Sequence, residues 1–281
     1  MPDASNLTPE QRVLLQQWFA DLEVVADWSW GLTDTVVLHA RSGGRDLVVK
    51  AAGPQNHHIA REIRAHREWV GPLADRGLAP RLLHAEESAN LLVTAHLEGE
   101  LALGTAAEGE AATYAQAGGL LALLHGQASR TDPDFEREQN ARTLRWLEGP
   151  HRIDADTAAE IRARVATFDC PPALLVPTHG DWQPRNWLAH GGCIRAIDFG
   201  RADWRPAFSD LARLAVQQFA DRPDLEAAFL AGYGTDPRDP DAWRRNQLRE
   251  AVGTACWAYQ VGDTSFETQG HRMIADALRV G

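Results

Sequence analysis

Short apolar runs alternate with turn residues over the first hundred positions, a pattern typical of an antiparallel sheet. The runs are rich in valine and leucine, and the turns carry glycine, asparagine or charged residues. Gly43 and Gly44 sit between two of the runs, where they indicate a hairpin. The pattern predicts five strands, at residues 22–26, 35–40, 46–52, 80–85 and 91–97.

After Gly99, apolar residues mostly follow helical spacing. Further strands are expected only around residues 174–197. Gly118-Gly119 lies within one predicted helix and indicates close helix packing there. We interpret Asp210 as the N-cap of a following helix. The sequence therefore predicts an α+β protein. Its helices are expected at residues 7–21, 59–73, 112–125, 135–147, 153–168, 211–219, 225–233, 241–261 and 266–280.

The stretch Thr178–Arg201 combines a loop and a hairpin with three oxygen-bearing side chains. Asn186 follows Asp181 by five residues, and Asp198 follows Asn186 by twelve. Gly191-Gly192 predicts a hairpin between them, which would bring Asn186 and Asp198 side by side near Asp181. Carboxylate and amide oxygens are the hard ligands that Mg²⁺ prefers.

Composition narrows the class of protein. With 44% hydrophobic and 24% charged residues, the 281-residue chain is typical of a globular protein. No apolar run is long enough to span a membrane and no signal peptide is visible, so we expect a cytoplasmic location. The three scattered cysteines argue against a disulfide framework or a zinc site.

The net charge of −11 makes nucleic acid an unexpected partner and favours cationic small molecules. Surface solubility is an equally good explanation of this charge. The acids Asp132, Asp134, Glu136 and Glu138 could face such a substrate, but acids at a helix start are more often simply solvated there.

Lys50 is the single lysine among 28 basic residues. Where arginine replaces lysine everywhere else, the remaining lysine is a candidate for chemistry that a bulky planar guanidinium does not perform, such as compact charge pairing with phosphate.

His179-Gly180-Asp181, with Asn186 five residues on and Asp198-Phe199-Gly200 after a hairpin, resembles the catalytic core of eukaryotic-like kinases. The central glycine is similar to the aminoglycoside phosphotransferase and choline kinase family. The resemblance implies a bilobal protein-kinase-like fold, with an N-lobe of five antiparallel strands and one helix at 1–98 and a mostly helical C-lobe at 99–281.

The resemblance also implies roles for individual residues. Asp181 is the expected catalytic base, and Asn186 and Asp198 are the expected Mg²⁺ ligands. Lys50 is expected to bind the α- and β-phosphates of ATP. Glu62, twelve residues later on a predicted helix, is the expected partner of Lys50, and Glu68 is the alternative. If Glu62 has no such role, it is simply a solvated acid on the surface of this helix.

The nucleotide contacts implied by the family are less well specified. Ser29 and Gly31 fall where the family has its phosphate-covering loop, which here holds one glycine. Thr94 and His96 fall where a strand leads into the segment that binds adenine. Arg185 and Arg201 flank the metal ligands, where each is either a phosphate contact or a surface cation.

The resemblance predicts an ATP- and Mg²⁺-dependent phosphotransferase acting on a hydroxyl group. Its similarity to antibiotic phosphotransferases, together with the acidic charge, favours a cationic antibiotic as acceptor and thus antibiotic resistance. The tuberactinomycin-type peptides such as capreomycin come first and aminoglycosides next. Two alternatives remain: a metabolic kinase for an amino sugar, choline or homoserine, and a non-catalytic nucleotide-binding pseudokinase.

Overall fold

The computed structural model describes residues 6–29 and 34–279, which form two compact units. The first unit takes the described residues within Met1–Gln127, Pro177–Asp203 and Arg222–Thr235, and the second takes those within Ala128–Val176, Trp204–Asp221 and Asp236–Gly281. The division at residues 98 and 99 predicted from the sequence stays a prediction.

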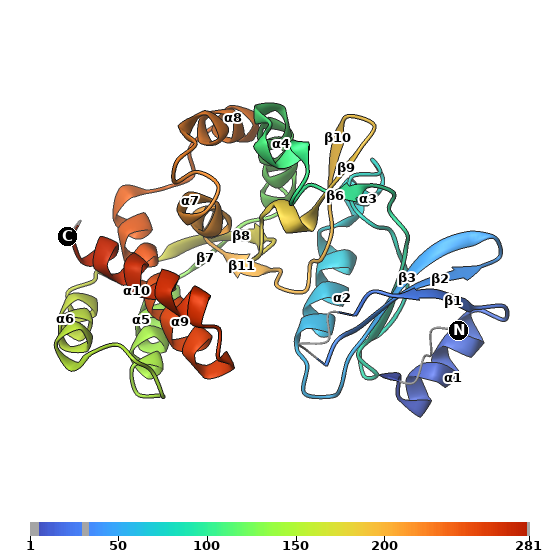
Figure 1. The fold of residues 1–281 in the computed structure, drawn as a ribbon, viewed down its shortest axis with the longest axis horizontal. Coiled ribbons are helices and arrows are strands. Elements are labelled where there is room, and N and C mark those ends of the chain that lie inside the picture. The colour runs from blue at the N-terminus through green and yellow to red at the C-terminus, as the bar shows by residue number, and fades with distance from the viewer. Residues whose placement is uncertain (1–5, 30–33, 280–281) are drawn as a thin grey trace. The chain divides into compact units, whose positions relative to one another are not determined.

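The first unit contains the predicted five-stranded antiparallel sheet, in the order β1-β2-β3-β5-β4 (Figure 1). The predicted hairpin joins β2 to β3, and Gly43 and Gly44 take the positive φ angles of 56° and 72° that its turn requires. The strands are β1 (Glu23–Asp27), β2 (Val36–Ser42), β3 (Arg45–Ala51), β4 (Leu82–Glu86) and β5 (Leu91–Ala95).

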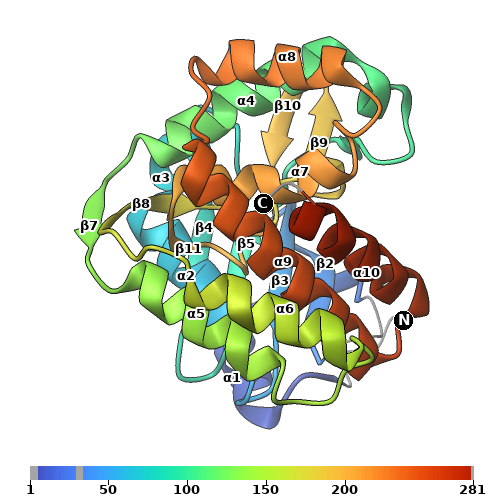
Figure 2. The same cartoon turned by 90° about the vertical axis from the view of Figure 1, so that its left-hand side faces the viewer.

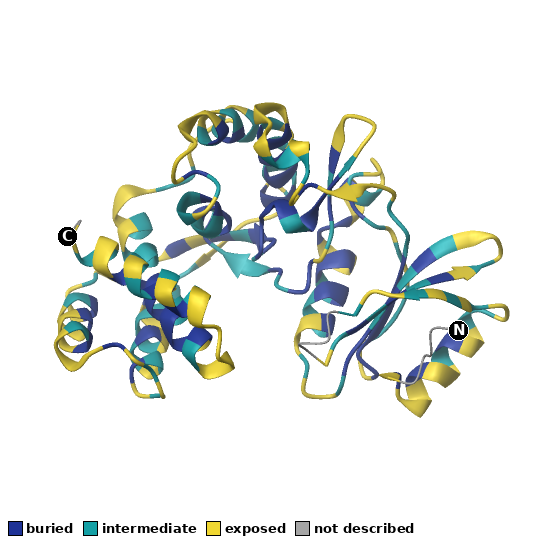
Figure 3. Ribbon diagram, in the orientation of Figure 1, coloured by how far each residue is buried: buried dark blue, intermediate teal, exposed yellow. Residues whose placement is uncertain are grey.

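Each face of this sheet is covered by a different helix. Leu38 and Val49 are buried in a cluster with Leu15 of the N-terminal helix α1 (Pro9–Trp18). On the opposite face, Leu92 packs with Ile59 of α2 (His58–Glu68). Strand residues alternate between faces, so one sheet supports both clusters. The dark blue residues of the sheet and α2 in Figure 3 mark this core.

Two further hairpin strands, β9 (Trp187–His190) and β10 (Cys193–Ala196), lie in the same unit. They pair antiparallel from Trp187 opposite Ala196, and their turn places Gly191 and Gly192 at φ angles of 56° and 78°. The short strand β6 (Glu100–Leu101) adds to β9. The expectation that strands cease after Gly99 outside residues 174–197 is therefore wrong, because two-residue and three-residue strands carry no visible alternation.

Helices α4 and α8 of the first unit pack against each other through glycine. A Cβ atom at Gly118 of α4 would lie 2.1 Å from the carbonyl oxygen of Phe229, and one at Gly232 of α8 would lie 1.8 Å from that of Ala115. The predicted close helix packing is confirmed. Helix α4 spans Ala111–His125 and α8 spans Pro223–Tyr233. The other helices of this unit not yet named are α3 (Gly71–Ala74), η2 (Ala106–Gly109) and η3 (Pro184–Asn186).

The second unit is mostly helical, and Figure 2 shows its helices α5, α6, α9 and α10. A buried cluster joins Ile161, Val252 and Ile274 from three of them. The helices are α5 (Phe135–Trp146), α6 (Ala155–Ala166), η4 (Ala207–Leu211), α7 (Ala212–Val216), α9 (Pro240–Val261) and α10 (Thr264–Arg279). A small sheet is formed by β7 (Arg130–Asp132), β8 (Ala173–Thr178) and β11 (Asp203–Arg205).

Acidic residues in this unit have structural roles. Glu136 is 2% exposed and pairs with Arg245 and Arg249, while Asp132 accepts the backbone N–H of Phe135 at the start of α5. Asp210 lies inside η4, and Leu211 precedes α7, so the predicted N-cap at Asp210 is wrong. The helix expected at residues 211–219 is the shorter α7, which the 3-10 turn η4 precedes.

Among the described residues, no helix combines the length and the apolar character needed to cross a membrane.

The α4–α8 contact predicts opposite effects for adjacent glycines. Gly118→Ala forces the helices apart and should lower the free energy of unfolding by about 2 kcal/mol, the usual cost of overpacking. Gly119→Ala is the matched control, because its Cβ would lie 3.5 Å from the nearest atom. It should keep or raise stability by up to about 1 kcal/mol through helix propensity. Urea unfolding measures both, and equal effects would contradict the packing described.

Candidate active site

One ammonium group joins three segments of the first unit. The Nζ atom of Lys50 donates to both carboxylate oxygens of Glu62, at 2.8 and 3.0 Å, and to Oδ1 of Asp198 at 3.0 Å. Lys50 lies on β3, Glu62 on α2, and Asp198 two residues after β10. The structure thus brings together the lysine, its expected partner and one expected metal ligand, and Glu62 rather than Glu68 makes the contact.

The charges of this cluster hold Lys50 and Asp198 ionised. Burial acts to lower the pKa of Lys50, but the carboxylates of Asp198 and Glu62 outweigh it and raise that pKa. The charge of Lys50 lowers the pKa of Asp198 to about 2. Burial raises the pKa of Glu62 against the opposing charge of Lys50. The half-exposed carboxylate of Asp198 is therefore charged at neutral pH and suits a further cation.

Helix α2 delivers Glu62 because its buried stripe includes a polar position. Ile59, Ile63 and His66 are buried at positions i, i+4 and i+7, and Glu62 at i+3 lies on the same face with 4% exposure. The backbone N–H of Phe199 also donates to Glu62. The Glu62 carboxylate is therefore held from two directions.

Asp198 is aimed by an unusual backbone conformation. Its φ angle is 67°, in the left-handed region that few residues other than glycine adopt, although aspartate is enriched there. The preceding residue, Ile197, donates its backbone N–H to the carbonyl oxygen of Asn186 at 3.0 Å. The hairpin therefore places Asn186 and Asp198 at its open end, as predicted.

The loop before the hairpin surrounds Asp181 with donors. Gln183 Nε2 donates to Oδ1 of Asp181, Arg185 Nη2 donates to Oδ2, and Asn186 Nδ2 donates to Oδ2 at 3.1 Å and to the backbone oxygen of Asp181 at 2.8 Å. Asp181 is 4% exposed. Its carboxylate is therefore fixed in orientation, as a group that must meet a substrate proton requires.

His179 braces this loop. Its Nε2 lies 3.0 Å from the carbonyl oxygen of Ile197, and its Nδ1 accepts the backbone N–H of Asp181 at 3.3 Å. In the first contact Nε2 is the donor, and in the second Nδ1 is the acceptor. The ring also contacts Trp182 and Phe199, so this fully buried histidine connects Asp181 to the segment that carries Asp198.

The expected nucleotide contacts lie on the sheet beside Lys50. On strand β5, Leu92 pairs with Lys50 of β3 and Thr94 pairs with Val48 of β3. Paired residues, and residues two apart on one strand, point to the same face of a sheet, so Thr94 faces the same side as Lys50. Ser29 accepts the backbone N–H of Val37 through its hydroxyl. Gly31 lies outside the described residues. These contacts with nucleotide stay predictions.

Two aromatic residues beside His96 were not predicted. The Trp28 ring stacks on His39 at 4.8 Å, and His96 lies 5.2 Å from His39. The backbone N–H of His96 donates to the carbonyl oxygen of Asp46. Only the carbonyl group and the imidazole ring of His96 are therefore available to contact an adenine ring. Trp28 gave no signal in the sequence, because one tryptophan among ten is not distinctive, and His39 gave none beyond its place in a predicted strand.

The polar side chains fit a magnesium ion bound with phosphate. Asn186 uses its amide nitrogen on Asp181, which turns its oxygen elsewhere, and the Asp198 side chain is half exposed. An amide and a carboxylate oxygen, with further ligands from phosphate and water, are the ligands that Mg²⁺ takes in phosphoryl-transfer sites. Within the described part of the chain, no three His, Cys, Asp or Glu side chains gather as a metal site on their own.

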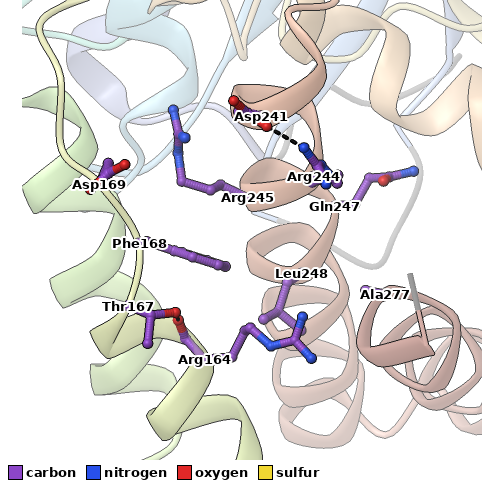
Figure 4. Close-up of a pocket in the computed structure, with 10 residues that line it drawn as sticks. All are labelled: Arg164, Thr167, Phe168, Asp169, Asp241, Arg244, Arg245, Gln247, Leu248 and Ala277. Atoms are coloured by element: carbon purple, nitrogen blue, oxygen red, sulfur yellow. Dashed lines mark hydrogen bonds and ion pairs between the residues drawn. The ribbon is translucent and has the colours of Figure 1, made fainter. Parts of the chain in front are cut away.

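A separate cavity of about 360 Å³ lies in the second unit (Figure 4). It is lined by residues of α9 and of the end of α6, among them Arg164, Phe168, Arg244 and Arg245. None of the predicted site residues that the structure describes lines it. Two of the arginines that line the cavity are already paired with acids. Arg244 pairs with Asp241, and Arg245 pairs with the buried Glu136.

His66 makes stability depend on pH. Burial, then the charge of Lys50, lowers the pKa of His66 to about 3. The unfolded residue takes up a proton below about pH 6.5, but the folded one does not, so stability is lost as pH falls from 6.5 toward 3.

Between pH 7.5 and 5.5 wild type should therefore lose about 1 kcal/mol more stability than His66→Leu, in urea unfolding at both pH values. Parallel losses in the two proteins would contradict a neutral buried ring.

Comparison with known proteins agrees with the fold. The model of the phosphotransferase enzyme family (APH) matches residues 26–245. No match was found among curated proteins. Solved structures with the same kinase-like fold include aminoglycoside phosphotransferase APH(4)-Ia, with a TM-score of 0.69, 16% identity and 99% of each chain covered. Complexes of a thermostable mutant of that enzyme contain hygromycin B with ADP or AMP-PNP.

Two other similar structures have different acceptors in their names. Choline kinase LicA from Streptococcus pneumoniae has a TM-score of 0.67 and 14% identity, covering 98% of this chain and 100% of its own. Macrolide 2'-phosphotransferase MphH from Brachybacterium faecium has a TM-score of 0.59 and 19% identity, covering 95% and 98%. The family match spans most of the sequence and includes every described residue of the cluster around Lys50. The chain belongs to the phosphotransferase enzyme family.

Proposed function

We propose that this protein transfers the γ-phosphoryl group of ATP, with Mg²⁺, to a hydroxyl group of a cationic small molecule. The observation that carries the proposal is the bonding of Lys50 to both Glu62 and Asp198, within the same unit as the Asp181 loop. The nucleotides bound in the complexes of the APH(4)-Ia mutant support ATP as the donor.

Lys50 binds the α- and β-phosphates in this proposal. Glu62 holds the ammonium through two hydrogen bonds from a buried position, so Lys50 keeps its place when phosphate competes with Asp198. Asp198, on a half-exposed side chain, is then available to the metal. Positioning and charge neutralisation supply most of the acceleration in such reactions.

Asp181 orients the acceptor hydroxyl and accepts its proton. Its carboxylate is already fixed by Gln183, Arg185 and Asn186, so little reorganisation is needed when the acceptor arrives. Asn186 and Asp198 would hold Mg²⁺, which would neutralise phosphate charge. A pseudokinase is disfavoured, because Lys50, Asp181, Asn186 and Asp198 are all present in one unit.

For the acceptor, we favour a cationic antibiotic, with tuberactinomycin-type peptides such as capreomycin first and aminoglycosides next. The acidic net charge and the antibiotic phosphotransferases among the similar structures support this choice. Choline is the second candidate, because the choline kinase LicA is similar over almost the whole of both chains. Choline and the cationic antibiotics are both positively charged, so both suit the acidic protein. Because the reaction needs ATP, we assign it to the cytoplasm.

The test is phosphorylation of capreomycin, an aminoglycoside and choline with MgATP, followed by mass spectrometry. Wild type should add about 80 Da to one of them, the mass of a phosphoryl group. Asp181→Ala and Asp198→Ala should each reduce turnover at least about 1000-fold, because they remove the base and a metal ligand.

Glu68→Ala is the matched control, since Glu68 lies on the same helix as Glu62 without contacting Lys50, and it should leave turnover unchanged. Turnover within about tenfold of wild type for either aspartate variant would contradict the roles assigned to these residues.

A further inference from the structure

We propose that Arg185 is a second cation of the reaction centre, which positions Asp181 before nucleotide binds and contacts the transferring γ-phosphoryl group afterwards. The proposal rests on the function proposed above and adds a residue to it. The sequence left Arg185 open as either a phosphate contact or a surface cation, and its contacts decide between these.

The environment of Arg185 differs from that of a surface arginine. Its Nη2 donates to Oδ2 of Asp181, whose side chain is 4% exposed, while its own side chain is 36% exposed. In contrast, Arg81 pairs with Asp75, and these side chains are 58% and 67% exposed. Pairing between exposed partners contributes little, whereas a buried carboxylate depends on its partner. Arg185 is therefore tied to the buried base and also reaches solvent.

Arg185 and the neighbouring expected metal ligand meet at one oxygen of the base. Arg185 Nη2 and Asn186 Nδ2 both donate to Oδ2 of Asp181. The 3-10 turn Pro184–Asn186 fixes the residue, since Arg185 lies one position before Asn186. The guanidinium therefore lies beside both the base and an expected metal ligand, where the transferring phosphoryl group would pass.

The reaction places charge on the γ-phosphoryl group, where a further cation can stabilise it. The acceptor oxygen forms a bond to the γ-phosphorus and gives its proton to Asp181. The bond from phosphorus to the bridging oxygen breaks, and ADP leaves with the electron pair. Charge then lies on the equatorial oxygens of the γ-phosphoryl group, away from the α- and β-phosphates assigned to Lys50.

A guanidinium has five N–H donors in a planar fork, so Arg185 can bond Asp181 with one side and a phosphoryl oxygen with another.

The test compares binding of ADP and AMP-PNP, with Mg²⁺, by calorimetry. ADP lacks the γ-phosphoryl group, so Arg185→Gln should weaken AMP-PNP binding about tenfold or more and change ADP binding less than about twofold. In turnover, kcat should fall at least about 100-fold while KM for the acceptor changes little. Arg81→Gln, the control in an exposed pair, should match wild type in every measurement.

Two results would overturn the proposal. Unchanged AMP-PNP affinity in Arg185→Gln would mean that Arg185 does not contact the γ-phosphoryl group. Equal weakening of ADP and AMP-PNP would mean that the residue only supports the loop. The nucleotide measurements stay informative if no acceptor is phosphorylated, because that result counts against the proposed function alone.

Discussion

The ion cluster of Lys50, Glu62 and Asp198 is the interaction on which the candidate site depends. It links a central strand of the sheet, the helix that covers one face of that sheet, and the segment after the β9–β10 hairpin. Each partner is held by its own element: Lys50 by strand pairing on both sides, Glu62 by the buried stripe of α2, and Asp198 by a positive φ angle. Because each partner is held by its own element, the cluster is preorganised rather than assembled by ligand.

Preorganisation of like charges has a physical consequence. Two carboxylates share one ammonium, and Asp181 lies nearby with Arg185 as its own cation. The two cations complement the oxygens of a polyphosphate, and the carboxylates complement the divalent metal ion bound with it. The ring of His179 contacts both the backbone of Asp181 and the carbonyl group of Ile197, next to Asp198. It therefore holds the base and the segment with the metal ligand in fixed positions relative to each other.

Much of this could be predicted from the sequence, because the determining signals are local. Glycine pairs fixed both hairpins, period-2 runs gave the five strands, and the spacing from Asp181 to Asp198 placed three oxygen ligands together. Signals failed where tertiary contacts decide. Strands β6, β7 and β11 are too short to alternate, and Asp210 lies in a 3-10 turn that resembles a helix start. The contact between Arg185 and Asp181, and the stack of Trp28 on His39, depend on side-chain directions that spacing alone does not give.

The most direct test of the central claim is the affinity of MgATP for Lys50→Met, measured by calorimetry beside wild type and the control Arg81→Gln. Methionine keeps the length of the side chain and removes its charge. If the ammonium held by Glu62 and Asp198 binds phosphate, affinity should fall at least about tenfold, equivalent to about 1.4 kcal/mol, in Lys50→Met alone. An unchanged affinity in Lys50→Met, with its fold intact, would contradict the account.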